Sequence, residues 1–175
     1  MQRRHVMLGL GGLGLAVAGI GFPLAWSKGG GPVAKGAQPP YDLDAASWTS
    51  RLSKEAYRVL FEHDTERPGS SPLDRETRAG QYICAACYLP LFSSAHKYDS
   101  GTGWPSFWQP LEGSLGTQTD YKLILPRTEY HCIRCKGHQG HVFNDGPAPT
   151  GKRYCNNGVA LQFVPEGDAI PEWTV

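Results

Sequence analysis

Four of the five cysteines in this 175-residue chain fall into two C-x-x-C pairs, and this spacing restricts the fold more than any other feature. The pairs are Cys84 with Cys87 and Cys132 with Cys135. Brought together, two such pairs supply the four thiolates of a tetrahedral structural zinc site. Because four thiolates leave no open coordination position, we expect one structural zinc ion per chain, which stabilises a small domain.

Other states of these four thiols remain open at this point. An exported protein can carry disulfides, so two local redox disulfides or a pair of long-range ones are an alternative to the metal. Iron is also chemically compatible with four thiolates, although the spacing favours zinc.

The N-terminal residues differ in composition from the rest of the chain. Arg3 and Arg4 precede an apolar run from Val6 to Trp26 that is interrupted by glycines. A basic pair ahead of an apolar segment is typical of an export signal, and the adjacent arginines resemble a twin-arginine signal. The run is also long enough for an uncleaved membrane anchor, which is the main alternative, and a cytoplasmic extension is a third.

This pattern divides the chain into three parts. Residues 1–28 are an export signal or membrane anchor, 29–40 are a flexible Gly- and Pro-rich linker, and 41–175 are the folded domain. On the first two interpretations the domain lies outside the cytoplasm, either in the periplasm or facing outward from an anchor, and only the N-terminal segment meets a membrane.

The charge distribution bears on possible partners. The formal net charge is +1, and residues 1–40 contribute four positive charges and no negative one, so the remainder carries −3. A mildly acidic body without a basic run argues against nucleic acid as a partner. We expect a monomer.

Short β segments dominate the expected structure of the body. Ser53 is placed to cap a helix that continues through Asp64, and Pro68 and Gly69 follow its end. Beyond this helix, short apolar segments are separated by Gly, Pro, Asn and Asp, which indicates strands and turns. The expected strands are 82–83, 91–92, 121–125, 141–143 and 159–164.

The fifth cysteine, Cys155, is left without a partner when the four others are assigned to the two pairs. A free cysteine is often a small buried apolar residue. Arg153 lies two residues before it, and His138 and His141 precede it in a turn-rich segment. Nearby positive charge lowers a thiol pKa and raises the population of the nucleophilic thiolate.

Several motifs together resemble the methionine sulfoxide reductase B family. Residues 82–87 resemble its first zinc knuckle, 98–107 its substrate-pocket loop, 137–147 its histidine loop and 149–155 its nucleophile strand. The motifs occur in the family's order over about 53–165. The resemblance implies a mainly β fold with two small antiparallel sheets, a short N-terminal helical segment and a pair of zinc knuckles.

The resemblance also implies an activity: reduction of the R epimer of methionine sulfoxide, in oxidised proteins or as the free amino acid. Cys155 would attack the sulfoxide sulfur and become a sulfenic acid, which a thiol reduces. The implied catalytic residues are Cys155, His141, His138, Asn157, Arg153 and Asp145, and the implied substrate-binding residues are Trp104 and Phe107.

Each role suits the chemistry of its residue. A sulfoxide sulfur is weakly electrophilic until its oxygen is protonated, and an imidazole of His141 or His138 can donate near neutral pH. Asn157 would also border that oxygen, while Arg153 would support the thiolate. By the same resemblance Asp145 would orient a histidine, and Trp104 would form an apolar wall against the substrate.

Simpler roles are open for the same residues. Trp104 beside Pro105 can be an ordinary core residue, and the two histidines can lie at the surface or support the metal. Arg153 can simply pair with Asp145 or Glu129.

The chain departs from the family pattern at three positions. Thr102 stands where a resolving cysteine can occur, so we expect an external thiol, from a thioredoxin-like protein or a small molecule, to reduce the sulfenic acid directly. Asn144 replaces the first residue of a usual Asp-Asp pair, and Gly158 replaces a common serine, which is expected to loosen the strand after the nucleophile.

Two other classes of protein fit parts of the sequence. A non-catalytic, zinc-stabilised β binding module would use the same scaffold without needing Cys155, Trp104 and His141. A thiol–disulfide oxidoreductase would use one C-x-x-C pair as its redox centre, which a bound zinc ion would exclude.

Overall fold

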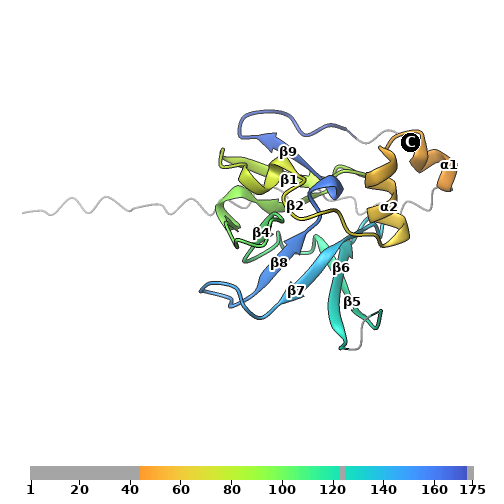
Figure 1. Ribbon diagram of the computed structural model, residues 1–175. Coiled ribbons are helices and arrows are strands. Elements are labelled where there is room, and N and C mark those ends of the chain that lie inside the picture. The colour runs from red at the N-terminus through yellow and green to blue at the C-terminus, as the bar shows by residue number, and fades with distance from the viewer. Residues whose placement is uncertain (1–43, 123–124, 173–175) are drawn as a thin grey trace, which may run out of the picture. The chain divides into compact units, whose positions relative to one another are not determined.

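The computed structural model describes residues 44–122 and 125–172 (Figure 1). The predicted export signal or anchor, linker and domain start lie outside these residues. Within the described part of the chain, no helix combines the length and apolar character needed to cross a membrane.

Two short helices open the described part of the chain: α1 (Ala45–Thr49), which was not predicted, and α2 (Lys54–Glu62). The predicted cap of α2 is confirmed, since the Ser53 hydroxyl accepts a hydrogen bond from the Ala56 amide at 3.1 Å. The helix ends earlier than predicted, because His63 takes the left-handed conformation with φ 54°.

The smaller sheet has three antiparallel strands in the order β2 (Pro90–Ser93), β1 (Gly80–Cys84) and β9 (Leu161–Pro165). Its central strand β1 therefore pairs with both a sequence neighbour and the last strand of the chain. This arrangement brings the C-terminal strand beside the first knuckle (Figure 1).

The larger sheet has six strands, and all its neighbours are antiparallel. Short 3-10 turns lie at Pro72–Arg75, Ser94–His96 and Gly158–Ala160. The order of strands across the sheet is β3 (Lys97–Tyr98), β4 (Ser106–Phe107), β8 (Arg153–Asn156), β7 (His138–Phe143), β6 (Arg127–Cys132) and β5 (Leu115–Asp120).

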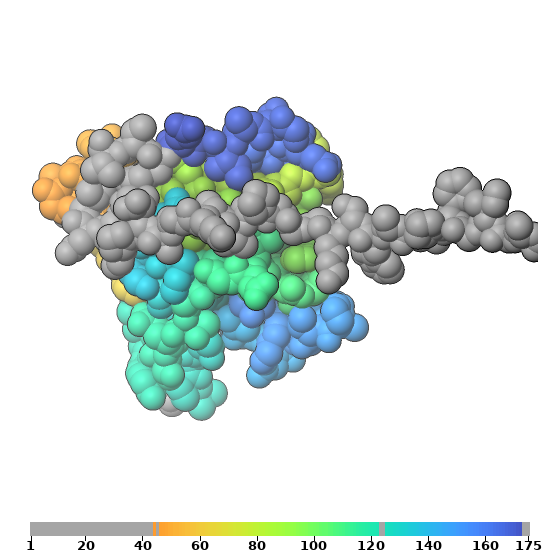
Figure 2. Space-filling view, turned by 180° about the vertical axis from the view of Figure 1, so that it is seen from behind, coloured from red at the N-terminus to blue at the C-terminus, as the bar shows by residue number. Residues whose placement is uncertain are grey.

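The ends of the larger sheet's hairpins project from the body. Figure 2 shows the β5–β6 end and the β7–β8 end as two protrusions separated by a notch. Tyr121 and Leu125, at the β5–β6 end, have exposed fractions of 78% and 75%.

An aromatic core joins the two sheets. Phe92 of the smaller sheet stacks on Phe107 of the larger one, with ring centroids 4.2 Å apart. Tyr82 meets the edge of Phe107 at 4.9 Å, and Tyr130 lies 6.1 Å from Phe92. All four side chains have no exposed surface, so each contributes a large apolar burial.

The predicted fold class is confirmed, but two predicted strands are wrong in detail. In the expected 121–125 strand, residues 121, 122 and 125 are described; they lie outside any strand, and Tyr121 and Leu125 are highly exposed. The 159–164 segment begins inside a 3-10 turn, and the strand starts only at Leu161. β3, β4, β5 and β6 are not among the expected strands, whereas β8 overlaps the segment that resembles the nucleophile strand.

Candidate active site and metal-binding cage

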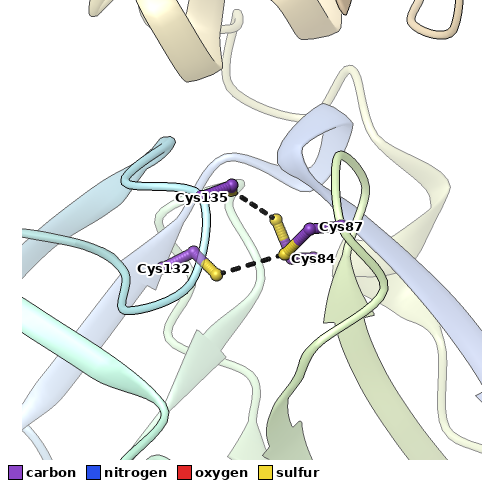
Figure 3. A group of neighbouring side chains, drawn as sticks. All are labelled: Cys84, Cys87, Cys132 and Cys135. Carbon is purple, nitrogen blue, oxygen red and sulfur yellow. Dashed lines mark hydrogen bonds between the residues drawn. The ribbon is translucent and has the colours of Figure 1, made fainter. Parts of the chain in front are cut away.

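The four paired cysteines converge on one point between the sheets (Figure 3). Their sulfur atoms all lie within 4.8 Å of one another, and all four residues are buried. The Sγ atoms of Cys84 and Cys135 are 3.6 Å apart, and those of Cys87 and Cys132 are 3.5 Å apart. We call this group of four cysteines the cage.

The same backbone turn builds both halves of the cage. The Cys84 amide donates to Leu89 O at 2.8 Å, and Tyr88 N donates back to Cys84 O. The second half repeats this pattern, with Cys132, Gly137 and Lys136 in the corresponding places, the Cys132 N to Gly137 O distance being 3.0 Å. Tyr88 and Lys136 both take a left-handed conformation, with φ 57° and 61°. The two C-x-x-C pairs are thus equivalent knuckles, one from each sheet.

The donor set fits a tetrahedral metal ion. Zn–S bonds of about 2.3 Å place the sulfurs of a tetrahedral site about 3.8 Å apart, near the observed separations, whereas a disulfide needs about 2.05 Å. Burial raises the pKa of the Cys84 thiol, and a bound cation reverses this effect by favouring the thiolate. The cage can therefore hold a metal ion, and the separations do not fit the disulfides that were the alternative to it.

A side chain next to the cage connects it to the larger sheet. Gln139 is fully buried, and its amide donates to Cys84 Sγ at 3.4 Å. Its side-chain oxygen accepts from the Asn156 amide at 3.3 Å, one residue beyond Cys155.

Cys155 belongs to a single row of residues that crosses the larger sheet. Its partner on β4 is Ser106, its partner on β7 is His141, and Glu129 on β6 lies opposite His141. Residues directly opposite one another in antiparallel strands share a face. The thiol and the His141 imidazole therefore lie on the same side of the sheet.

A glycine holds this register. At Gly140, next to His141, an added Cβ would overlap the Cys155 carbonyl oxygen. Tyr130 of β6 is paired with Gly140, and its hydroxyl donates to Asn156 Oδ1 of β8 at 2.8 Å. Strands β6, β7 and β8 are thus bound together where the row crosses them.

Two opposing effects act on the thiol. Burial raises the pKa of Cys155, while the charge of Arg153 and hydrogen bonds from Thr102 and Arg153 lower it. The predicted influence of Arg153 is present, but burial outweighs it, so the pKa of the substrate-free thiol lies above its ordinary value.

Hydroxyl groups line the approach to Cys155 from the loop before β4. Thr102 and Ser106 each lie 2.8 Å from the Ser100 hydroxyl, so the three form a continuous chain. Thr102 ends this chain at the thiol.

His141 has a carboxylate partner that the sequence did not indicate. Its Nε2 lies 2.8 Å from Asp120 Oδ2. The Lys122 amide first, then His141 and Arg127, hold the pKa of Asp120 well below its usual range. Because an ionised carboxylate only accepts, Nε2 of His141 carries the hydrogen and Nδ1 is the ring atom left for other partners.

His138 forms a second imidazole–carboxylate pair. Its Nδ1 lies 2.7 Å from Glu129 Oε1, and its ring centroid is 5.4 Å from that of His141. Burial lowers the pKa of His138 to about 4, against the opposing effect of Glu129, so the ring is neutral at pH 7. Burial alone would raise the pKa of Glu129, but hydrogen bonds from Gln118 and His138 lower it overall.

Glu66 connects several predicted site residues. Its carbonyl accepts from Trp104 Nε1 at 3.2 Å, and its amide donates to Asn157 Oδ1 at 3.1 Å. Its carboxylate accepts from the Gly158 and Val159 amides at 2.5 and 3.0 Å. A single residue from the loop after α2 thus fixes both the tryptophan and the segment after the nucleophile.

Three expectations about individual residues need correction. Asn157 does not border open space: it is buried, and its amide group is bound to the backbones of Glu66 and Gln139. Asp145 binds Arg153 through two 2.8 Å hydrogen bonds rather than orienting a histidine. Phe107 is a core residue, because the alternation along β4 that turns Ser106 toward Cys155 turns Phe107 the other way.

The partners missing from the sequence prediction are Asp120, Glu129 and Glu66. For Glu129, the sequence suggests only a possible pairing with Arg153. Asp120 lies 21 positions from His141, and Glu66 lies 38 positions from Trp104. No local spacing marks such contacts.

Comparison with known proteins adds to this geometry. Residues 52–165 match the model of the SelR domain. A "Peptide methionine sulfoxide reductase MsrB" of Agrobacterium fabrum is 46% identical over 128 residues, which cover 73% of this chain and 95% of that protein. The protein of the same name from Thiobacillus denitrificans is 49% identical, with 69% and 92% covered. That from Caulobacter vibrioides is 45% identical, with 77% and 85% covered.

A solved structure is also partly similar. The Mis18 "Yippee-like" domain aligns over 52% of this chain and 100% of its own, with a TM-score of 0.40 and 18% identity. A likeness at this level has no bearing on function.

Proposed function

This chain belongs to the SelR-domain family of MsrB-type peptide methionine sulfoxide reductases, and on that premise we propose that Cys155 is the nucleophile that reduces the R epimer. The chain is an oxidoreductase that acts on methionine sulfoxide and depends on a thiol reductant. The observation that supports the role of Cys155 is its row across the larger sheet, which sets a partly accessible thiol outside the cage directly opposite His141.

The reaction transfers one oxygen atom. The Cys155 thiolate attacks the sulfoxide sulfur and forms an S–S bond while a proton reaches the sulfoxide oxygen. The S–S bond and the substrate S–O bond then break as the oxygen bonds to the Cys155 sulfur. Methionine sulfoxide loses oxygen to become methionine, and the thiol becomes a sulfenic acid. Methionine leaves, and the oxidised enzyme awaits reduction.

His141 is the proposed proton donor. Asp120 holds its Nε2, which leaves Nδ1 as the atom that can carry a proton to the sulfoxide oxygen. The carboxylate of Asp120 fixes the orientation of the ring, so that Nδ1 is the atom available for general acid catalysis. The pair of His138 and Glu129 positions the second imidazole beside it.

Trp104 is the proposed apolar wall of the substrate site. Its indole is fixed by the Glu66 carbonyl, and the next residue, Pro105, accepts the Asn156 amide at 2.9 Å. The tryptophan therefore lies on a segment that is tied to the nucleophile strand. Asn157 and Arg153 act as positioning residues, one for the backbone and one for the charge near the thiol.

Zinc is the proposed occupant of the cage, one ion per chain, held by Cys84, Cys87, Cys132 and Cys135. When bound it stabilises the fold, since four thiolates leave no position for substrate. Cys155 is then the one cysteine left for chemistry. The non-catalytic binding module is not favoured, because it has no need of the Cys155–His141 pair.

Regeneration is proposed to use an external thiol directly, from a thioredoxin-like protein or a small molecule. The other four cysteines are in the cage, and Thr102 stands beside Cys155 where a resolving cysteine can occur. The first thiol displaces hydroxide from the sulfenic sulfur as water to form a mixed disulfide, and a second thiol then releases Cys155.

The test compares both sulfoxide epimers with a dithiol reductant in the wild type and in Cys155→Ser. We expect turnover of the R epimer by the wild type only, with unchanged metal content and unfolding temperature in the variant. Turnover of the R epimer by Cys155→Ser at the parental rate would refute the assignment.

The location of the enzyme is proposed from the sequence alone. The Arg3-Arg4 pair and the apolar run support export, by the twin-arginine route, or anchoring with the domain outside the cytoplasm. A fusion of residues 1–40 to a reporter tests this, and a reporter that stays in the cytoplasm would contradict it. We propose a monomer, which sedimentation of the purified chain can check.

A further inference from the structure

A second cluster of metal-ligating side chains lies outside the cage. His63 Nδ1 is 3.1 Å from Glu129 Oε1, and His138 Nδ1 is 2.7 Å from the same oxygen. One ligand atom from each of the three residues lies within 4.8 Å of the other two. We call this group the His–Glu–His cluster.

Three different elements hold the cluster in place. His63 ends α2 in the left-handed conformation, with its amide bonded to Arg58 O and its carbonyl accepting from Lys122 Nζ at 3.2 Å. Glu129 and His138 come from neighbouring strands β6 and β7. The second carboxylate oxygen of Glu129 is occupied by Gln118 at 3.0 Å, so Oε1 is the one that faces both imidazoles.

The spacing and the donor types suit one class of ion. Metal–nitrogen and metal–oxygen bonds of about 2.0–2.2 Å place adjacent ligand atoms about 3 Å apart, as observed here. Two imidazoles and a carboxylate suit zinc, nickel and copper(II), whereas magnesium and calcium require mainly oxygen ligands. The His63 side chain is 40% exposed, so an ion has a route from solvent and room for water ligands.

We propose that His63, Glu129 and His138 form a second metal site, which binds a borderline divalent transition ion such as Zn²⁺, Ni²⁺ or Cu²⁺. The ion inserts between the imidazoles and the carboxylate and replaces the two hydrogen bonds to Glu129. Each neutral imidazole carries its hydrogen on Nε2 in place of Nδ1 once Nδ1 becomes a ligand, so both rings stay neutral and no net proton is released.

Binding at this site inhibits the reductase. The ion takes His138 Nδ1 away from Glu129, and the His138 ring contacts that of His141, 5.4 Å away between centroids. This inhibitory consequence rests on the proposed function, whereas the binding itself does not.

Titration of the full-length protein that holds one zinc ion per chain, with excess zinc removed, tests the binding with Co²⁺ as the probe. We expect one cobalt ion to bind per chain in addition to the zinc ion of the cage. Its visible absorption should be that of Co²⁺ with nitrogen and oxygen ligands, and the near-ultraviolet charge-transfer band of a cobalt–thiolate bond should be absent. His63→Ala should weaken this binding at least about tenfold. His96→Ala is the matched control: His96 is also partly exposed, but its Nδ1 lies 3.0 Å from Gln109 O, outside the cluster.

The proposal is overturned if no second ion binds, if the thiolate band appears, or if the two histidine variants bind cobalt equally. In parallel, Ni²⁺ should inhibit wild type and His96→Ala but not His63→Ala, which should keep the metal-free rate. An inactive wild type with zinc in the cage and no added nickel would count against the proposed function and leave the cobalt result unaffected.

Discussion

At the scale of residues, the site places two imidazole–carboxylate pairs beside one thiol. His141 with Asp120 and His138 with Glu129 repeat the same arrangement, but the rings use different nitrogens. Consequently the ring nitrogen that is not bonded to the carboxylate is Nδ1 in His141 and Nε2 in His138. The two histidines are therefore not interchangeable, and a proton donor role suits the one opposite Cys155.

The contact between Thr102 and Cys155 leads to a prediction about recycling. In Thr102→Cys, a second thiol would lie within reach of the oxidised nucleophile, so one turnover without reductant should yield an intramolecular disulfide. The wild type should instead show a sulfenic acid that reacts with dimedone. Mass spectrometry after a single turnover distinguishes the two products, and a wild-type disulfide between Cys155 and a cage cysteine would contradict the proposal.

Arg153 leads to a prediction about pH. Its charge lowers the pKa of Cys155 against the effect of burial, so Arg153→Ala should raise that pKa and move thiolate formation to higher pH. Alkylation by iodoacetamide at neutral pH should slow about three- to tenfold. Arg153→Lys keeps the charge and should show a smaller change. A profile that moves to lower pH in Arg153→Ala would exclude this role.

Sequence and structure agree unevenly at this scale. The cage cysteines were predictable because each pair is local and its spacing fits a single turn. Asp120 and Glu66 were not, because their partners are brought together only by pairing of distant segments. The wrong role for Phe107 has the same origin, since motif membership does not reveal to which face a side chain points.

At the scale of elements, the segment after the nucleophile differs from the expectation. Gly158 begins a 3-10 turn, and its space is filled: an added Cβ would overlap the Ser71 side chain and come within 3.2 Å of Glu66 Oε1. The absence of a side chain at Gly158 therefore permits close packing of Ser71 and does not loosen a strand.

A pair of substitutions tests this packing. Gly158→Ser should destabilise the protein by about 1–3 kcal/mol, because the new side chain has no room. Adding Ser71→Gly removes the obstruction and should recover part of the loss, despite the lost hydrogen bond from the Leu73 amide to Ser71. Denaturant unfolding of the two single variants and the double variant measures the coupling, and simple additivity would disprove the packing explanation.

A helix or strand could be predicted from the sequence where its own residues show a clear pattern, such as a cap or a regular apolar face. α2 has a cap and an apolar face, so its start was found to the residue. β5, with the sequence LGTQTD, has little apolar alternation, so the sequence predicts a strand at the more apolar residues beyond it instead. Tyr121 and Leu125, the described apolar residues there, are exposed, so apolar character does not reflect burial at these two positions.

At the scale of the whole molecule, the cage joins the two sheets. One knuckle follows β1 of the smaller sheet, and the other follows β6 of the larger one. The aromatic core around Phe92 and Phe107 makes the other connection between them. The mainly β class was predictable from short segments and turns, whereas the pairing of β1 with β9 joins two distant segments that no motif relates.

Removal of the metal should therefore affect the whole domain. We expect chelation under denaturing conditions, followed by refolding without zinc, to lower the unfolding temperature by more than about 10 °C and to abolish reductase activity. Cys87→Ser should have a similar effect, and Cys155→Ser should not. Calorimetry with metal analysis measures both, and an unchanged unfolding temperature in the metal-free protein would show that the cage is dispensable.

The register of the larger sheet has a further consequence. Side chains alternate along a strand, so if β7 were to slip by one position against β8, the thiol would face either Val142 or the empty side of Gly140 instead of an imidazole. Such a misaligned chain would keep its composition, its strands and its bound metal and still be unable to protonate a sulfoxide. A larger residue at the position of Gly140 would collide with the Cys155 carbonyl, which disfavours the slipped pairing. Gly140 therefore helps to fix the register of β7 against β8, in addition to allowing the two strands to approach closely.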